Sequence, residues 1–255
     1  LLAHITILHA SSVLFFMCSW NALNDIYDFE IDLVNRPDRP LPSGRISLNH
    51  AKTATAITMI SSILSIALCY WLISGSNPVE GFEVSDWYPS LAIWIMALIL
   101  LINYEFPFGL RLKDKGLPGN ISISISVGLV VVFGASAVFE PFSEKAWSLF
   151  FVGIFYNTSR EIIKDVQDME GDKGRNTLAM RIGSENARTV AWMMSILALA
   201  SVLLPFAIGI FPPLHVVLVI PAVMTLMMVK GRIIIGEDDA ASSLLKKSML
   251  LCLAA

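Results

Sequence analysis

Residues 10–32 have the sequence ASSVLFFMCSWNALNDIYDFEID, in which an apolar stretch continues directly into an acidic one. The apolar part belongs to a longer run, residues 2–24, which is close to the roughly 20 residues that a membrane-spanning helix needs. In the acidic part, Asn24, Asp28 and Asp32 recur every fourth residue, so they lie along one face if the helix continues. The segment therefore predicts a membrane helix that ends in a row of oxygen ligands.

The composition points to the same class of protein. Hydrophobic residues make up 55% of the 255 residues, and charged residues make up 15%, against roughly 25% in soluble domains. These values exclude a disordered chain, a nucleic-acid-binding protein with a basic surface and nearly all soluble globular domains. The three cysteines lie in apolar segments at unrelated spacings, which argues against a disulfide framework or a zinc site. We therefore expect an integral membrane protein.

Eight apolar stretches of this kind occur along the chain. They lack the strict alternation of strands, and in lipid the backbone groups must form their hydrogen bonds within helices. We therefore expect an all-α fold, a polytopic membrane helix bundle with about eight transmembrane helices in this chain. The stretches are residues 2–24, 52–74, 89–105, 119–138, 146–163, 187–208, 212–229 and 244–255.

The basic residues support this topology. Of the 18 lysines and arginines, 17 fall in four alternate loops, which are residues 25–52, 111–117, 160–188 and 230–247. Loops rich in Lys and Arg stay on the cytoplasmic side, so we expect a multi-pass cell-membrane protein with an active site that faces the cytoplasm. This topology starts Leu1 on the outer side, which predicts a ninth helix in the native protein. Residues 1–255 are then a single transmembrane domain, a fragment that lacks the first helix and the end of the last.

A second acidic row follows the fifth apolar stretch. Residues 159–172 have the sequence SREIIKDVQDMEGD, where Lys164, Asp168 and Asp172 are again four residues apart. Because the row recurs four spans later and on the same side of the membrane, the chain has the pattern of a weak internal repeat. We expect two four-helix pseudo-repeats around a cytoplasm-facing cavity, with the two Asp pairs facing each other across it.

The acidic rows call for a compensating cation, because a charged side chain at the centre of a membrane helix costs on the order of 2.5–3.5 kcal/mol. Oxygen ligands suit Mg²⁺, which binds one or two carboxylates and shares its other positions with water and substrate phosphates. Several basic residues follow the first acidic row or the third apolar stretch, and they suit the remaining phosphate oxygens. They are Arg36, Arg39, Arg45, Arg111 and Lys113.

Each of these features also has a plain structural explanation. The acids could form a solvated face, and the basic residues could anchor the helices at the cytoplasmic surface. The four histidines, His4, His9, His50 and His215, are scattered, and we expect them to be packing or interface residues. Taken together, however, acids, Mg²⁺, cations and an apolar cavity suit the ionisation of an allylic diphosphate, since metal and cations stabilise charge on the departing diphosphate.

The acidic rows resemble the motifs of a known family. The row from Asn24 to Asp32, followed by NRPDRPLPSGR at residues 35–45, resembles the first motif of the UbiA-type intramembrane prenyltransferases. The pair Asp168 and Asp172 resembles the second motif. The resemblance covers nearly the whole chain, from the second helix of the family into the ninth.

Three segments are similar to archaeal digeranylgeranylglyceryl phosphate synthases, namely residues 104–113, 116–120 and 160–172. This similarity implies a geranylgeranyl diphosphate donor and a geranylgeranylglyceryl phosphate acceptor. The reaction would form the second ether bond of archaeal membrane lipids. Gln167 stands where an acid is more usual, and it lies off the face that carries Asp168.

The resemblance also implies roles for the polar residues of the two motifs. The metal ligands would be Asn24, Asp28 and Asp32 for one Mg²⁺, and Asp168 and Asp172 for the other. The phosphate ligands would be Arg36 and Lys113 for the diphosphate, Lys164 for the same group or for the acidic cluster, and Arg45 for the phosphate of the acceptor. The four Asp residues are the expected catalytic set, and the general base remains unassigned.

Two alternative functions stay open. Related enzymes prenylate aromatic acceptors in quinone, chlorophyll and tocopherol pathways, and an aromatic acceptor needs no second anion site. A transporter with acidic ion sites is the other alternative, although such sites usually lie near the bilayer midplane on broken helices. The expected partners are a prenyl diphosphate donor, a lipid-like acceptor and membrane lipids, with no nucleic acid and no obligate protein partner.

Overall fold

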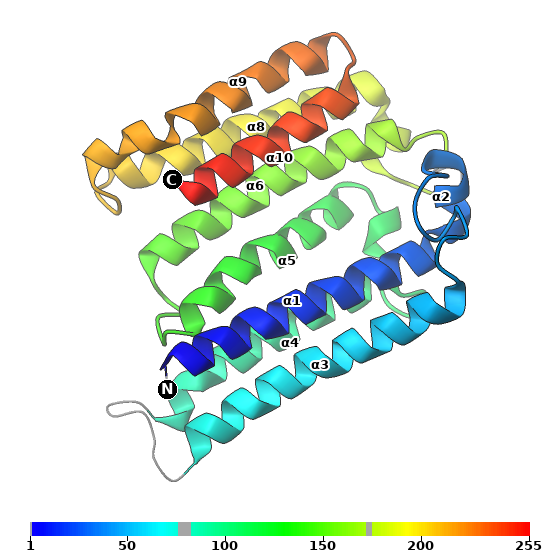
Figure 1. Ribbon diagram of the computed structural model, residues 1–255. Helices are drawn as coiled ribbons and strands as arrows, with labels where there is room; N and C mark the ends of the chain where they lie inside the picture. The colour runs from blue at the N-terminus through cyan, green and yellow to red at the C-terminus, as the bar shows by residue number, and fades with distance from the viewer. Residues whose placement is uncertain (1, 76–82, 172–174) are drawn as a thin grey trace. The chain divides into compact units, whose positions relative to one another are not determined.

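The structure, a computed structural model, describes residues 2–75, 83–171 and 175–255. Within these residues all regular secondary structure is helical, which confirms the all-α prediction (Figure 1). The α-helices are α1 (Leu2–Tyr27), α2 (Phe29–Asn35), α3 (Leu48–Ser74), α4 (Tyr88–Glu105), α5 (Leu117–Ser136), α6 (Glu144–Gln167), α7 (Leu178–Ile182), α8 (Ser184–Ala207), α9 (Ile220–Ile234) and α10 (Asp238–Ala254). The 3₁₀ helices are η1 (Val84–Trp87), η2 (Leu112–Asp114) and η3 (Pro213–Val219).

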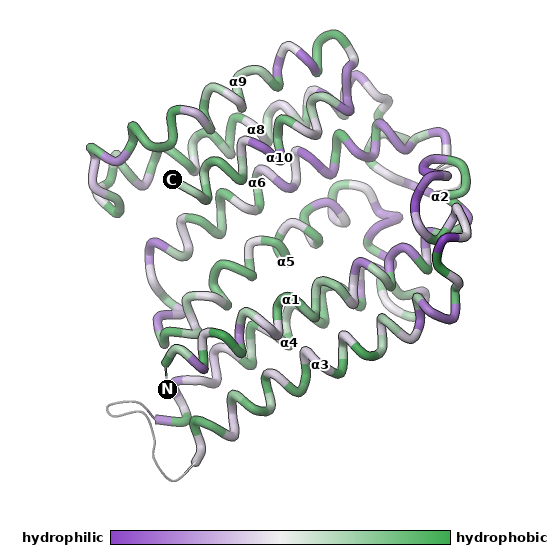
Figure 2. The backbone as a smooth tube through the Cα atoms, viewed as in Figure 1, coloured by the Kyte–Doolittle hydropathy of each residue, from purple (hydrophilic) through white to green (hydrophobic). Residues whose placement is uncertain are grey.

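Six helical segments of the described residues are long and apolar enough to cross a membrane. Figure 2 shows hydrophobic residues along much of α1, α3 and α9, and more hydrophilic ones along α6. The predicted stretches 146–163 and 244–255 form most of α6 and α10, but neither helix has the length and hydropathy of a candidate span. The six segments are Leu2–Tyr27, Leu48–Ser74, Val84–Glu105, Leu117–Ser136, Ser184–Ala207 and Pro213–Ile234.

The lower hydropathy of α6 has a cause in its packing. Ser159 on α6 is buried, and its Oγ donates to the backbone carbonyl of Ala191 on α8 at 2.8 Å. Asn157 is also buried, and its Nδ2 donates to Ser124 Oγ on α5 at 3.2 Å. Polar groups are tolerated inside a helix bundle when protein partners satisfy them. The polar side chains of α6 therefore indicate an inner helix that meets neighbouring helices on several faces.

The chain divides into two compact units. One comprises Leu1–Met96 and Val132–Phe142, and the other comprises Ala97–Val131 and Ser143–Ala255. The first unit holds the acidic row that begins at Asn24, and the second unit holds the row that follows α6. The single transmembrane domain expected over the whole chain stays a prediction.

In the first unit, polar side chains join the membrane helices. Ser12 Oγ on α1 lies 3.0 Å from Ser62 Oγ on α3. His9 is buried on α1, and its Nε2 lies 3.0 Å from Ser90 Oγ on α4. Such interhelical hydrogen bonds stabilise membrane bundles, by about 0.6 kcal/mol on average. His9 is therefore a packing residue, in agreement with the expectation.

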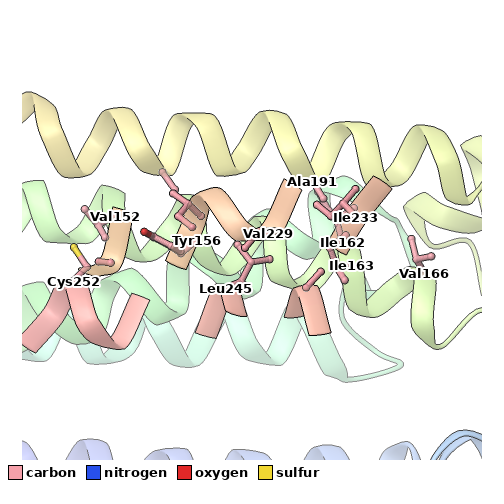
Figure 3. Close-up of a cluster of buried hydrophobic side chains, with 14 of the residues drawn as sticks. Val152, Tyr156, Ile162, Ile163, Val166, Ala191, Val229, Ile233, Leu245 and Cys252 are labelled. Atoms are coloured by element: carbon pink, nitrogen blue, oxygen red, sulfur yellow. The ribbon is translucent and has the colours of Figure 1, made fainter. Parts of the chain in front are cut away.

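The core of the second unit joins α6, α8, α9 and α10 (Figure 3). Tyr156 lies in this core, and its hydroxyl oxygen is 2.8 Å from Ser248 Oγ on α10. On another side of α6, Gly153 meets Gly128 of α5, where a Cβ added to Gly153 would lie 3.5 Å from Gly128 Cα. Small residues let membrane helices approach closely. These contacts hold the middle of α6 against α5 and α10.

Candidate active site

The first acidic row lies where α1 passes into α2, in the first unit. α1 ends at Tyr27, and Asp28 stands between the two helices with φ −92° and ψ 8°. The helical hydrogen bonds continue through this point, because Asp28 N–H donates to Asn24 C=O and Asp32 N–H donates to Asp28 C=O, both at 2.8 Å. The three residues therefore stay one helical turn apart, which agrees with the predicted spacing.

A cation and an amide contact the acids of this row. Arg39 Nη1 donates to Asp25 Oδ1 at 2.9 Å and to Asp32 Oδ2 at 2.6 Å. The Asp32 side chain is only 6% exposed, so its charge needs such a partner. Asn24 Nδ2 donates to Asp28 Oδ2 at 2.7 Å. Sequence reasoning named Arg39 as a nearby cation but missed this contact, because residue spacing does not show where the turn after α2 returns it.

That turn holds the two arginines predicted to bind phosphates. Prolines within residues 37–42 stop the helix, since proline lacks the N–H that a helix requires. Arg36 is the C-cap residue of α2. Arg45 donates to the backbone carbonyl of Asp38 and, from Nε, to Ser43 Oγ at 3.0 Å. Arg45 thus stabilises the turn itself, and the phosphate contacts of both arginines stay predictions.

The second acidic row begins at the C-terminal end of α6, in the second unit. Asp168 follows the last residue of the helix, and its N–H donates to Lys164 C=O at 2.9 Å. The Lys164 side chain donates from Nζ to Glu161 Oε2 at 2.9 Å, one turn away from Asp168. Asp172, the last member of the predicted row, lies outside the described residues. The helical spacing of Lys164 and Asp168 agrees with the prediction.

Two neighbouring helices hold this end of α6. Asn120 on α5 donates from Nδ2 to Asp165 Oδ2 at 3.0 Å. Gln167 donates from Nε2 to Asp239 Oδ1 on α10 at 2.7 Å. Gln167 therefore faces α10, which agrees with the inference that it lies off the face of Asp168. Sequence reasoning missed Asn120 and Asp239 as partners because they are far away along the chain.

Lys113, predicted to bind the diphosphate, is buried in a loop of the second unit. Its Nζ donates to Glu105 at the end of α4, and both side chains are almost fully buried. The same loop contains Arg111, which adopts a left-handed φ of 47° and pairs from Nε with Asp114 Oδ2 at 2.9 Å. Arg175 Nε lies 3.4 Å from the other oxygen of Asp114. These ion pairs fix the loop, and the diphosphate contact of Lys113 stays a prediction.

The side chains fit a magnesium ion by donor type. Among the described residues, no group of three or more His, Cys, Asp or Glu is placed to hold a metal ion. Mg²⁺, however, is usually held by one or two carboxylates together with substrate phosphates and water. Asp28 and Asp32 in one unit and Asp168 in the other supply oxygen atoms of this kind. These carboxylates, with arginine and lysine nearby, are of the chemical type that a magnesium–phosphate group requires.

The sequence is similar to those of known prenyltransferases. The profile of the UbiA prenyltransferase family matches residues 2–251. The chain is 30% identical over 253 residues to the digeranylgeranylglyceryl phosphate synthase of Methanobrevibacter smithii, covering 96% of this chain and 83% of that protein. It is 34% identical over 240 residues to the enzyme of the same name from Methanopyrus kandleri, covering 92% of this chain and 80% of that protein.

Two solved structures have a similar fold. One is a structure of digeranylgeranylglyceryl phosphate synthase in membranes, with a TM-score of 0.62 and 28% identity over 96% of this chain and 80% of that one. The other is a UbiA homolog from Archaeoglobus fulgidus bound to GPP and Mg²⁺. Its TM-score is 0.60 with 16% identity, over 99% of this chain and 88% of that one, so it supports the fold alone.

Proposed function

Because this chain belongs to the UbiA prenyltransferase family, we propose that it transfers a geranylgeranyl group from geranylgeranyl diphosphate to geranylgeranylglyceryl phosphate. The product would carry the second ether bond of an archaeal membrane lipid. The observation that carries this proposal is the match over most of the chain, at 30–34% identity, to relatives named for this synthase. The protein is an integral membrane enzyme with six apolar helices in its described residues.

The transfer exchanges one carbon–oxygen bond for another. The bond between the first prenyl carbon and the diphosphate breaks, and the diphosphate leaves with the bonding electrons. The hydroxyl oxygen of the acceptor bonds to that carbon and loses its proton. When bound, Mg²⁺ would neutralise the negative charge that builds on the leaving diphosphate. Apolar helices around the reacting carbon would exclude water, which could otherwise capture the cation.

The two acidic motifs supply the proposed metal and diphosphate ligands. Their recurrence at the ends of two helices, each among basic residues, supports this assignment. Arg36, Lys113 and Lys164 would bind diphosphate oxygens once the donor arrives. Lys113 and Lys164 would then either leave the glutamates that they now contact or contact the glutamate and the diphosphate together. The metal ligands are those expected from the motifs, namely Asn24, Asp28, Asp32, Asp168 and Asp172.

The proposal includes the topology that positions both motifs on one membrane face. We place α6 and α10 in the membrane with the six apolar segments, which gives eight transmembrane helices in this chain. The chain then forms two four-helix pseudo-repeats whose motifs act on one donor from the cytoplasmic side. The distribution of 17 of 18 basic residues into alternate loops supports this orientation.

One assay tests the reaction and the acceptor together. Membranes that contain the protein receive labelled geranylgeranyl diphosphate and Mg²⁺, with geranylgeranylglyceryl phosphate or 4-hydroxybenzoate offered in parallel. We expect transfer to the glycerol phosphate alone, its loss in EDTA and its return when Mg²⁺ is added back. Transfer only to 4-hydroxybenzoate would contradict the proposed acceptor and keep the family chemistry. A folded protein that transfers to neither acceptor would contradict the proposal as a whole.

A further inference from the structure

Arg160 on α6 carries a buried nitrogen that the motifs do not explain. Its Nε is buried and has no hydrogen-bond partner among the described residues. Its Nη1 donates to Glu161 Oε1 at 3.0 Å. A buried donor left without a partner costs free energy, more so on a charged group, and such groups are rare in folded proteins. The unpaired Nε therefore suggests that Arg160 has a partner in the working enzyme.

The surroundings of Arg160 favour an anion as that partner. Glu161 is shared by two cations, since its other oxygen accepts from Lys164 Nζ at 2.9 Å. The Glu161 side chain is 14% exposed, whereas Arg160 and Lys164 are only half-buried. One carboxylate thus holds two positive side chains in place. Arg160, Glu161 and Lys164 together carry a net positive charge and N–H donors that Glu161 does not use. A phosphate-binding site requires both.

The position of Arg160 on α6 aligns it with the second acidic row. Arg160, Lys164 and Asp168 are spaced i, i+4 and i+8, so they lie along one face of the helix. With a rise of 1.5 Å per residue, Arg160 lies about 12 Å from Asp168 along the helix axis, and Lys164 lies about halfway between them.

Among the described residues, no hydrogen bond connects Arg160 itself to a neighbouring helix. Within the described residues, the hydrogen bonds that connect this part of α6 with α5, α8 and α10 come from other side chains, which are Tyr156, Asn157, Ser159, Asp165 and Gln167. Hydrogen bonding between helices therefore does not explain why an arginine stands at position 160.

We propose that Arg160 binds the phosphate of the acceptor, the role that the family resemblance gave to Arg45, and this inference rests on the proposed function. Arg45 instead donates to Ser43 and to the backbone of Asp38 within its own turn. A guanidinium binds phosphate through two parallel N–H groups. Arg188 in this chain uses such an edge, with Nε 2.9 Å and Nη2 2.7 Å from the two oxygens of Asp238. In Arg160 Nη1 is engaged by Glu161, so the edge formed by Nε and Nη2 would bind the phosphate.

The position of Arg160 on α6 indicates that it binds the acceptor rather than the donor. The donor diphosphate is assigned to Asp168 and Lys164, and Arg160 lies one turn further from the end of α6. The acceptor carries its phosphate and its reacting hydroxyl on one three-carbon glycerol, so both must lie within a few ångströms of the prenyl carbon. A second phosphate so close to the diphosphate needs a cation of its own, because two anions repel each other.

The test measures transfer by the full chain in membranes, with each substrate varied in turn. Arg160→Gln should raise the KM for geranylgeranylglyceryl phosphate by about tenfold or more, the magnitude of a lost charged hydrogen bond. The KM for the donor should stay close to that of the unmodified protein. Arg160→Lys should recover part of the loss, because lysine keeps the charge but not the paired N–H groups. Arg232→Gln, which removes an exposed arginine paired with Glu237, is the matched control and should change neither KM.

A second acceptor separates phosphate binding from a structural effect. Geranylgeranylglycerol lacks the phosphate, so the unmodified protein and Arg160→Gln should use it equally well. A loss of the same size with both acceptors, or a rise in the donor KM alone, would overturn the proposal. If Arg160→Gln does not fold, the comparison of the two acceptors with Arg160→Lys decides the question. If the unmodified protein fails to use geranylgeranylglyceryl phosphate, the proposed function fails instead, and the two failures are thus distinguishable.

Discussion

At the scale of single residues, the first motif is balanced by Arg39. One guanidinium nitrogen contacts Asp25 and Asp32, so the motif has a positive charge of its own beside a nearly buried carboxylate. The sequence predicts which acids share a helical turn, because a period of four residues is a local property. It does not predict that Arg39 returns to them across a turn rich in proline, because that contact depends on the fold of the turn.

Removal of this arginine should make the protein depend on added metal. Arg39→Gln leaves Asp25 and Asp32 close together without a cation, and we expect a loss of about 1–3 kcal/mol in stability. Because a metal at this motif would replace the missing charge, Mg²⁺ should raise the melting temperature of Arg39→Gln more than that of the unmodified protein. Thermal unfolding in detergent, with and without Mg²⁺, measures both effects. Arg45→Gln is the control, and an equal response to Mg²⁺ in both variants would contradict a metal at this motif.

The acids of both motifs should be essential for turnover and dispensable for folding. Asp28→Ala and Asp168→Ala should each lower the rate of transfer by about 100-fold or more, since a bound metal supplies several kcal/mol of charge stabilisation. The labelled-donor assay gives the rates, and size-exclusion chromatography in detergent reports folding. Glu140→Ala changes an exposed acid outside both motifs and serves as the control. Substantial activity in either motif variant would contradict a magnesium site in each unit.

At the scale of secondary-structure elements, the sequence predicts where the helices lie but not how they contact one another. The stretch 146–163 lies within α6, because apolar runs and helix-forming residues are local signals. The sequence does not show that α6 is an inner helix, since its serines and asparagine have partners on α5 and α8. Nor does it show that α10 holds the end of α6 through Asp239.

The contact between Gln167 and Asp239 can be tested by exchanging charges. Gln167→Glu places two carboxylates side by side, and we expect a loss of about 1 kcal/mol, because the contact is exposed to solvent. The double variant Gln167→Glu with Asp239→Asn restores an amide–carboxylate pair in the opposite direction. Its melting temperature should return toward that of the unmodified protein. If the second substitution gives no recovery, the contact does not stabilise the end of α6.

At the scale of the whole molecule, the chain consists of two compact units, and each unit carries one acidic motif. The composition and the alternation of basic loops predict a membrane protein. Both are properties of the whole chain that do not depend on which residues contact one another. The recurrence of the acidic row at residues 164–172 predicts the duplication of the motif. That both motifs act on one donor belongs to the proposed function.

If both motifs bind one donor, a bound donor analogue should slow amide hydrogen exchange at both motifs. An unreactive thio-analogue of geranylgeranyl diphosphate, added with Mg²⁺, should slow amide hydrogen exchange at the junction of α1 and α2 and at the end of α6. The segment around residues 139–143, which the proposed topology places on the outer side, should exchange at an unchanged rate and serves as an internal control. Exchange measured by mass spectrometry resolves these peptides. Protection confined to one of the two motifs would contradict binding of one donor by both.

The hydrogen bond between Tyr156 and Ser248 has a consequence for biogenesis. The two residues are 92 positions apart, so the ribosome completes α6 long before it synthesises its partner on α10. During that interval the hydroxyl of Tyr156 lacks the partner that it has in the folded protein. In the proposed topology, this part of α6 therefore reaches its final packing only after α10 has been synthesised.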